Sequence, residues 1–207
     1  MCGRYYCLTE EEFTEICQII QEVSLRIAYD DFSISKDQGE VRPTDIAPVI
    51  IQNTPGMISF ENLKWGFKRW DGKGAPIINA RSETLREKTM FSRLVDTGRC
   101  VVPANEYYEW EKVDRKKIKH FVKDAEGKKL FMAGLYRNTS QGREFVIITK
   151  DATDDIARIH DRMPVILHAN QIEGWLNGSL STDDIVKMDF KATVLPCNDE
   201  GIQMKLL

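Results

Sequence analysis

Short apolar runs of strand length, separated by turn residues, constrain the fold of this chain most strongly. Such runs predict strands at residues 49–51, 57–67, 99–104, 120–123, 129–135, 144–149, 165–167 and 192–196, and an extended conformation is one interpretation of residues 106–110. A helix is predicted to begin at Thr9, further helices are predicted at 82–94 and 171–176, and the segment 151–162 begins helically. No repeat, low-complexity tract or linker divides the 207 residues, so we expect one domain, 1–207.

The first helix has a start signal as well as an apolar face. Thr9 and Glu12 fit the capping-box pattern, in which each side chain bonds the backbone amide of the other residue. Apolar residues then recur at helical spacing at positions 13, 16, 19 and 20. The polar stretch 29–40, which contains a glycine, is predicted to be a loop.

Composition excludes several classes of protein. The net charge is −3, so the chain is not a polycation, and any binding to phosphates must come from a local basic patch. There is no secretory signal, and no apolar stretch approaches about 18 residues, so we expect a cytoplasmic protein with no membrane partner. The five cysteines are scattered without a CxxC pair, which argues against a zinc site or a disulfide framework.

Cys2 follows the initiator methionine directly. If Met1 is removed, Cys2 carries an α-amine with a pKa of about 8 and a thiol with a pKa of about 8.5 on adjacent carbons. Such a 1,2-aminothiol can attack a carbonyl with its own amine as base, or condense with an aldehyde to close a thiazolidine ring. The alternative is a chance cysteine in a frayed terminus. The apolar run 5–8 favours a packed terminus instead.

Two further segments carry side chains suited to binding DNA. Residues 64–70 are basic with two interleaved tryptophans, of which Trp65 is expected in the core. Trp70 precedes a glycine-rich loop and is expected to be exposed, where it could stack on an unpaired base. In the segment 79–84, alternation would place Asn79, Arg81 and Glu83 on one face of a strand; the alternative is a polar strand edge or a helix cap.

Two candidate acid–base residues stand apart in the sequence. If residues 106–110 are extended, Glu109 shares a face with Tyr107, and a glutamate between aromatic residues is desolvated, which raises its pKa. The alternative is a surface glutamate. His160 has charged neighbours and precedes a proline-led apolar strand, whereas His120 and His168 are interpreted as structural or exposed.

Four stretches together resemble one family. They are residues 1–4, 79–84, 99–110 and 159–164, in this order and with cysteine at position two. The chain resembles, over essentially its whole length, the SRAP family of SOS response-associated peptidases or abasic-site processing proteins. The resemblance implies an α+β fold: a single compact domain around a curved, barrel-like, mostly antiparallel sheet with flanking helices. It also implies a partner, single-stranded DNA containing abasic sites, which the protein captures covalently.

The resemblance also implies roles for individual residues. Cys2 is the crosslinking nucleophile, Asn79 holds the cysteine and its adduct, and Glu109 and His160 are catalytic. The implied DNA contacts are Arg4, Arg81 and Arg162 at phosphates, and Pro48, Trp70 and Met90 in an apolar wedge beside the lesion. No metal or other cofactor is implied, and we expect a cytoplasmic monomer, nucleoid-associated if the source is bacterial.

One position departs from the family pattern, and two other functions compete. Glu106 stands where the family usually has glycine, which adds a carboxylate close to the expected site. The first competing function is a thiol peptidase or N-terminal-nucleophile hydrolase using Cys2, and the family name reflects self-removal of Met1. The second is a noncovalent single-stranded DNA-binding module in which Cys2 is incidental.

Overall fold

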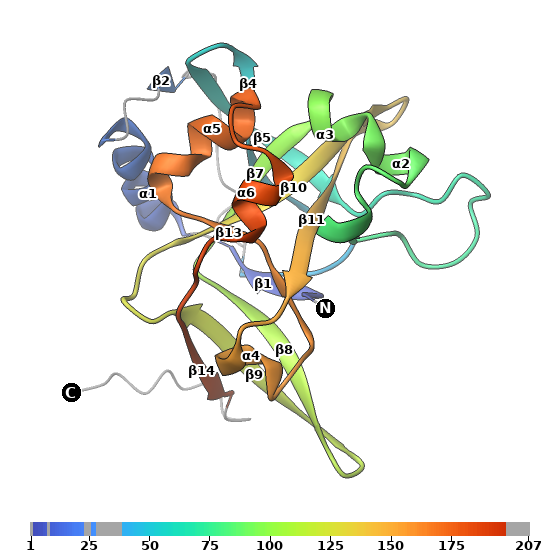
Figure 1. Cartoon of the computed structure of the whole chain (residues 1–207), viewed down its shortest axis with the longest axis vertical. Coiled ribbons are helices and arrows are strands. Elements are labelled where there is room, and N and C mark those ends of the chain that lie inside the picture. Colours follow the sequence, from blue (N-terminus) through green and yellow to red (C-terminus); the bar gives the residue numbers. More distant parts are fainter. Residues whose placement is uncertain (1, 8, 23–25, 28–38, 198–207) are drawn as a thin grey trace.

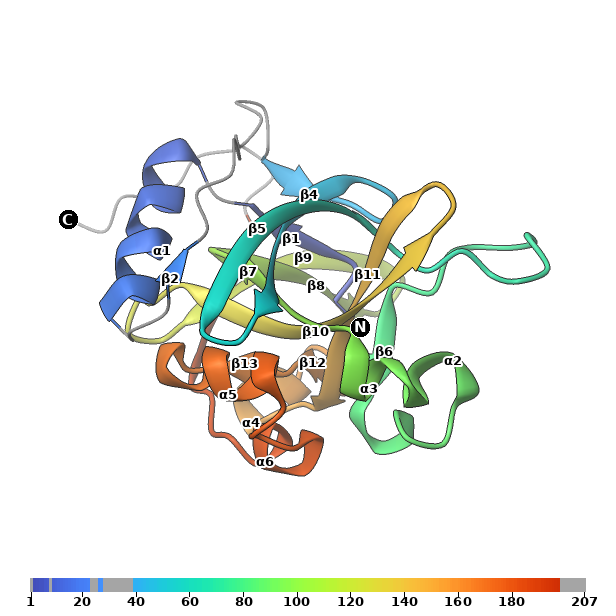
Figure 2. The ribbon, with the colours of Figure 1, turned by 90° about the horizontal axis from the view of Figure 1, so that it is seen from above.

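A five-stranded barrel forms the centre of the computed structural model, which describes residues 2–7, 9–22, 26–27 and 39–197. Its strands are β4 (Ile46–Thr54), β5 (Met57–Trp65), β7 (Arg99–Ala104), β10 (Leu130–Thr139) and β11 (Gly142–Asp151). Antiparallel pairs join them in the order β5, β4, β7, β10 and β11. A parallel pairing of β11 with β5 closes the ring (Figure 2).

Short strands extend this sheet at its edges. They are β2 (Arg26–Ile27) on β5, β6 (Asn79–Arg81) and β12 (Arg162–Pro164) on β11, and β13 (Ile166–Leu167) on β10. A second, antiparallel sheet has the order β14 (Ala192–Pro196), β9 (Lys116–Asp124), β8 (Glu106–Val113), β1 (Arg4–Tyr6) and β3 (Glu40–Val41). It lies below the barrel in Figure 1.

Alternation along the barrel strands divides the core into two clusters. Val102 and Ile147 face a cluster that includes Tyr5 and Tyr107 of the second sheet, whereas Val101 and Ile148 face a cluster that includes side chains from most of the helices. The helical segments are α1 (Glu10–Glu22), η1 (Ser82–Thr84), α2 (Thr89–Ser92), α3 (Leu94–Thr97), α4 (Asp154–Ala157), η2 (Ala169–Gln171), α5 (Ile172–Asn177) and α6 (Thr182–Val186). No helix within the described residues is long and apolar enough to cross a membrane.

The structure confirms the predicted α+β, barrel-like, mostly antiparallel fold with flanking helices. The capping box is present, since the Thr9 amide donates to Glu12 at 2.8 Å and the Glu12 amide donates to Thr9 Oγ1 at 3.3 Å. The loop predicted at 29–40 lies outside the described residues except at its end. There the prediction is wrong for Glu40, which begins β3 and pairs with Tyr6.

The helix predicted at 82–94 is wrong, because the chain forms three short helical segments there instead. Lys88, which directly precedes α2, has an extended backbone, so the helical conformation is interrupted there. Leu85, Phe91 and Val95 are all buried in the same cluster. One continuous helix would place Leu85 and Phe91 about 120° apart around its axis, so the break allows both to face the sheet.

Gly134 of β10 lies where two neighbouring strands approach closely. A Cβ there would be 2.8 Å from the backbone oxygen of Val146 and 2.9 Å from Cys100 Sγ. We therefore expect Gly134→Ala to lower the free energy of unfolding by about 1–3 kcal/mol, measured by denaturant titration. Gly39→Ala is the control, since its Cβ would meet only the Tyr6 ring at 3.8 Å. Equal stabilities of the two variants would contradict this account of barrel packing.

Candidate active site

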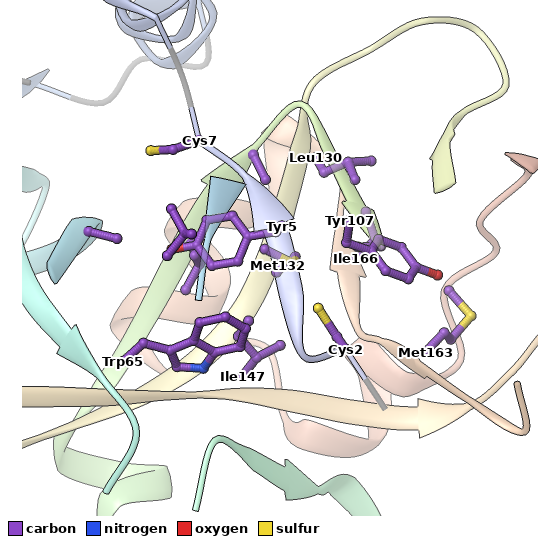
Figure 3. Close-up of a cluster of buried hydrophobic side chains, with 14 of the residues drawn as sticks. Cys2, Tyr5, Cys7, Trp65, Tyr107, Leu130, Met132, Ile147, Met163 and Ile166 are labelled. Carbon is purple, nitrogen blue, oxygen red and sulfur yellow. The ribbon is translucent and has the colours of Figure 1, made fainter. Parts of the chain in front are cut away.

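Cys2 is buried in the core, with none of its surface exposed. It precedes β1, whose pairing with β8 fixes the start of the chain across the second sheet. Asn79 reaches it from β6, and its side-chain Nδ2 donates a hydrogen bond to the Cys2 carbonyl oxygen at 2.9 Å. Figure 3 shows the Cys2 thiol among Tyr107, Ile147 and Met163. The terminus is therefore packed, as the apolar run that follows it predicted.

Glu109 extends from β8 and is only 2% exposed. Burial is the main cause that raises the pKa of this carboxyl from 4.5 to about 7; the N-terminal amine opposes this rise, and the charge of Asp161 contributes to it. Burial also raises the pKa of the Cys2 thiol well above its ordinary value, and the negative charge of Glu109 adds to this effect. Cys2 is thus a neutral thiol beside a carboxyl group that exchanges protons near neutral pH.

His160 lies in the turn between α4 and β12, and Asp161 beside it is close enough to act on Glu109. Burial lowers the pKa of the His160 imidazole, which favours its neutral form. When the ring is neutral with its proton on Nε2, Nδ1 accepts a hydrogen bond from the Arg162 amide at 3.0 Å. The same nitrogen is 2.8 Å from Asp161 Oδ1, and that contact becomes an ion pair when the ring is protonated.

Tyr107 is a member of the site that the sequence analysis did not assign. It is fully buried on the Glu109 face of β8, and its hydroxyl has no hydrogen-bond partner within the described part of the chain. Burial raises its pKa, and the charges of Cys2 and Glu109 contribute. The sequence already indicated the position of Tyr107, because strand alternation placed Tyr107 and Glu109 on one face.

Arg162 connects the two motifs that flank the site. The residue is 6% exposed, and its guanidinium donates to both carboxylate oxygens of Glu83, at 2.6 and 2.9 Å, and to the Thr149 carbonyl at 2.8 Å. It also pairs with Asp151. These acceptors occupy both terminal nitrogens, so Arg162 fixes the position of η1 relative to β12. Glu83 lies in η1, so the alternation predicted along 79–84 ends at Arg81.

Arg4 belongs to a cluster of three cations around one carboxylate. Its Nη1 is 2.9 Å from Glu40 Oε1, Arg42 Nε is 3.1 Å from the same oxygen, and Lys119 also pairs with Glu40. Burial opposes ionisation of Glu40, but hydrogen bonds and charges from these cations outweigh it and lower its pKa. The guanidinium of Arg4 also lies 5.1 Å above the Trp110 ring. Arg4 is therefore held in one orientation beside Cys2.

The other predicted DNA contacts lie on separate segments. Arg81 is exposed at the end of β6, and Trp70 is 93% exposed in the loop between β5 and β6. Met90 is half-buried in α2, and Pro48 is buried within β4. The exposure of Arg81 and Trp70 is compatible with their predicted contacts with DNA. Trp65, expected in the core, is fully buried.

The carboxylate of Glu106 is neutralised within its own sheet. One oxygen accepts a hydrogen bond from the Tyr108 hydroxyl at 2.6 Å, and the other is 2.9 Å from Lys123 Nζ. Its charge is therefore balanced at the position where the resemblance implies a glycine. Within the described residues, no group of three histidine, cysteine or acidic side chains is placed to hold a metal ion.

Comparison with known proteins identifies the family. Residues 1–203 match the family SOS response associated peptidase (SRAP). The chain belongs to the SRAP family. It is 34% identical over 202 residues to "Abasic site processing protein YoqW" of Bacillus subtilis, with 90% of this chain and 85% of that protein covered. It is 27% identical over 192 residues to "Abasic site processing protein YedK" of Escherichia coli, with coverage of 87% and 82%.

The family's fold also appears among solved structures. A protein from Bacteroides thetaiotaomicron superposes with a TM-score of 0.75 at 24% identity and covers 96% of this chain and 93% of its own. A phage-related protein from Bordetella bronchiseptica gives a TM-score of 0.72 at 22% identity, with coverage of 95% and 94%. At these identities, the likeness shows that the SRAP member described here shares their fold.

Glu109 should make stability depend on pH. Between pH 4.5 and about 7 the folded state holds a proton that the unfolded state has released, so stability falls as the pH rises through this range. We expect Glu109→Gln, which removes this loss of about 3 kcal/mol, to melt several degrees higher relative to wild type at pH 8 than at pH 5. Exposed Glu87→Gln is the control. A constant difference in melting temperature across this pH range would refute the raised pKa.

Proposed function

We propose that this chain binds single-stranded DNA and captures abasic sites covalently through the amine and thiol of Cys2. Membership of the SRAP family supports the proposal, as do relatives named abasic site processing proteins at 27–35% identity. The observation that supports the proposal most directly is the geometry around Cys2. Asn79 holds the Cys2 carbonyl beside Glu109, a carboxyl group whose pKa is about 7.

The chemistry requires a free α-amine on Cys2, so Met1, which lies outside the described residues, must be removed first. The amine adds to the open-chain aldehyde of the abasic sugar, and loss of one water gives an imine. The thiol then adds across the C=N bond, its proton passes to nitrogen, and a thiazolidine forms. Ring closure diverts the imine from the β-elimination that would break the strand, so the adduct protects the lesion.

Glu109 and His160 divide the proton transfers in this proposal. Glu109 exchanges protons near neutral pH, which suits it to ring opening, to amine addition and to taking the proton of the neutral Cys2 thiol. His160 carries a proton on Nε2 in its neutral form and moves protons at the sugar hydroxyl and during reversal. Asn79 keeps hydrogen-bonding the same carbonyl in the adduct.

The DNA contacts of the proposal follow the exposure of the side chains. Arg4 and Arg81 hold phosphates, and Trp70 stacks on a base beside the lesion. The assignments of Pro48 and Met90 to the wedge and of Arg162 to a phosphate stay predictions. For Arg162, a phosphate would have to replace one of the acceptors that the guanidinium already bonds.

Peptidase activity is the second candidate, because the family's description names a peptidase. The peptidase reaction that we consider is hydrolysis of the Met1–Cys2 amide, which would precede capture. A neutral, buried thiol is a poor nucleophile for external peptides, since the thiolate is the reactive form. We also propose that the protein acts on DNA in the cytoplasm as a monomer.

A denaturing gel with abasic single-stranded DNA tests the proposal. Wild type should give a shifted band that survives heating, and Cys2→Ala should abolish this band while noncovalent DNA binding persists. Cys2→Ser keeps the amine and should form only an imine, trapped when a reductant is added. Peptide turnover without a shifted band would favour the hydrolase, and neither activity would favour a binding module. A durable crosslink by Cys2→Ala without reductant would refute the mechanism.

Substitution of the two acid–base residues should affect different steps. Glu109→Gln is nearly isosteric and should slow crosslink formation by about 10²–10⁴-fold with DNA binding intact. His160→Gln should slow formation less and slow release of a preformed adduct more. Time courses followed by a chase with excess abasic DNA measure both steps. Equal losses at every step would refute the division of roles, and wild-type rates in both variants would show that neither residue is catalytic.

A further inference from the structure

A basic groove lies outside the site around Cys2. It has a volume of about 290 Å³ and runs between the end of β5, the loop between β5 and β6, and the β10–β11 hairpin. Four cations, Lys64, Lys68, Arg69 and Arg143, line it, together with the single carboxylate of Glu144. In a chain whose net charge is −3, this is a local concentration of positive charge.

The charges of the groove are unequally neutralised. Glu144 receives two hydrogen bonds from Arg137, at 2.7 and 3.0 Å, so its charge is already balanced. Arg143 pairs with Glu61. Lys64, Lys68 and Arg69 make no ion pair with any carboxylate within the described part of the chain. Three positive charges are therefore available to an anionic ligand.

The groove is anchored before any ligand arrives. Arg137 donates to the Lys68 carbonyl at 2.7 Å, and the Lys68 amide donates to Glu144 at 3.2 Å. Paired backbone hydrogen bonds between Phe67 and Ile77, at 2.8 and 3.0 Å, close the base of the loop. The cations are thus presented on a fixed wall, with the 93%-exposed Trp70 next in sequence.

The groove also lies close to the capture site. Pro76 lines the groove, and Asn79, three residues later in nearly extended chain, bonds Cys2. Along β11, the residue that pairs with Lys64 is three positions from the one that pairs with Asn79. Three strand residues span about 10 Å, a distance that a few nucleotides cover. Figure 2 shows the loop leading back to β6 beside the N-terminus.

We propose that this groove binds the phosphates of the DNA strand that flanks the abasic site, through Lys64, Lys68 and Arg69. The inference rests on the proposed function, since that function supplies the strand. It extends the footprint beyond Arg4 and Arg81. Because lysine and arginine there contact phosphates and not base edges, the groove adds affinity without sequence preference.

The test compares Lys64→Gln/Lys68→Gln with the charge-matched control Lys187→Gln/Lys191→Gln, whose lysines are exposed beside α6 and β14. Fluorescence anisotropy measures binding of an undamaged 12-nucleotide strand against salt concentration. Removing two phosphate contacts should lower the affinity and make the slope of log K against log salt shallower by about 1.4. The control and Lys64→Arg/Lys68→Arg should keep the wild-type slope.

Two outcomes separate this inference from the proposed function. If wild type crosslinks abasic DNA but the groove variant binds the 12-mer with the slope of the control, the groove inference is overturned and capture stands. If wild type forms no crosslink while the groove variant still loses affinity and slope, capture fails and the groove remains a phosphate site.

Discussion

The pairings of β11 are the constraint on which the rest of the structure depends. This strand closes the barrel against β5 and also carries β6 and β12 on its other half. One strand thus places Asn79 and the His160–Arg162 motif around the same end of the barrel. The second sheet contributes Glu109 and, through β1, the position of Cys2. The proposed capture chemistry needs groups from all these segments, so it would depend on barrel closure.

Barrel closure fixes the positions of the charged groups of the site, and these positions determine its electrostatics. Glu109 is buried against aromatic and apolar side chains, and burial moves its pKa towards neutrality, where a single group can both accept and donate protons. Around this dry centre the charges are balanced: Arg162 by Glu83 and Asp151, Arg4 by Glu40, and Glu106 by Lys123. Fixed partners of this kind orient a side chain before a substrate arrives.

Patterns within a few residues predicted much of this arrangement. Strand alternation placed Glu109 on a buried face with Tyr107, and the capping box located the start of α1. The bond from Asn79 to Cys2 spans 77 positions and the pair of Lys119 with Glu40 spans 79, so no local pattern reveals either contact. The interrupted helix after Arg81 was missed for a similar reason, because tertiary burial of Leu85 and Phe91 decides it.

The complete burial of Cys2 has a consequence for its survival under oxidising conditions. Oxidation of cysteine to sulfenic acid, and its exchange with disulfides, begins from an accessible thiolate. Cys2 has no exposed surface, and both burial and the neighbouring Glu109 hold its thiol in the protonated form. Peroxides and mixed disulfides therefore react slowly with this sulfur. Under the proposed function, the fold would keep the aminothiol in an inert form until a substrate displaces its packing.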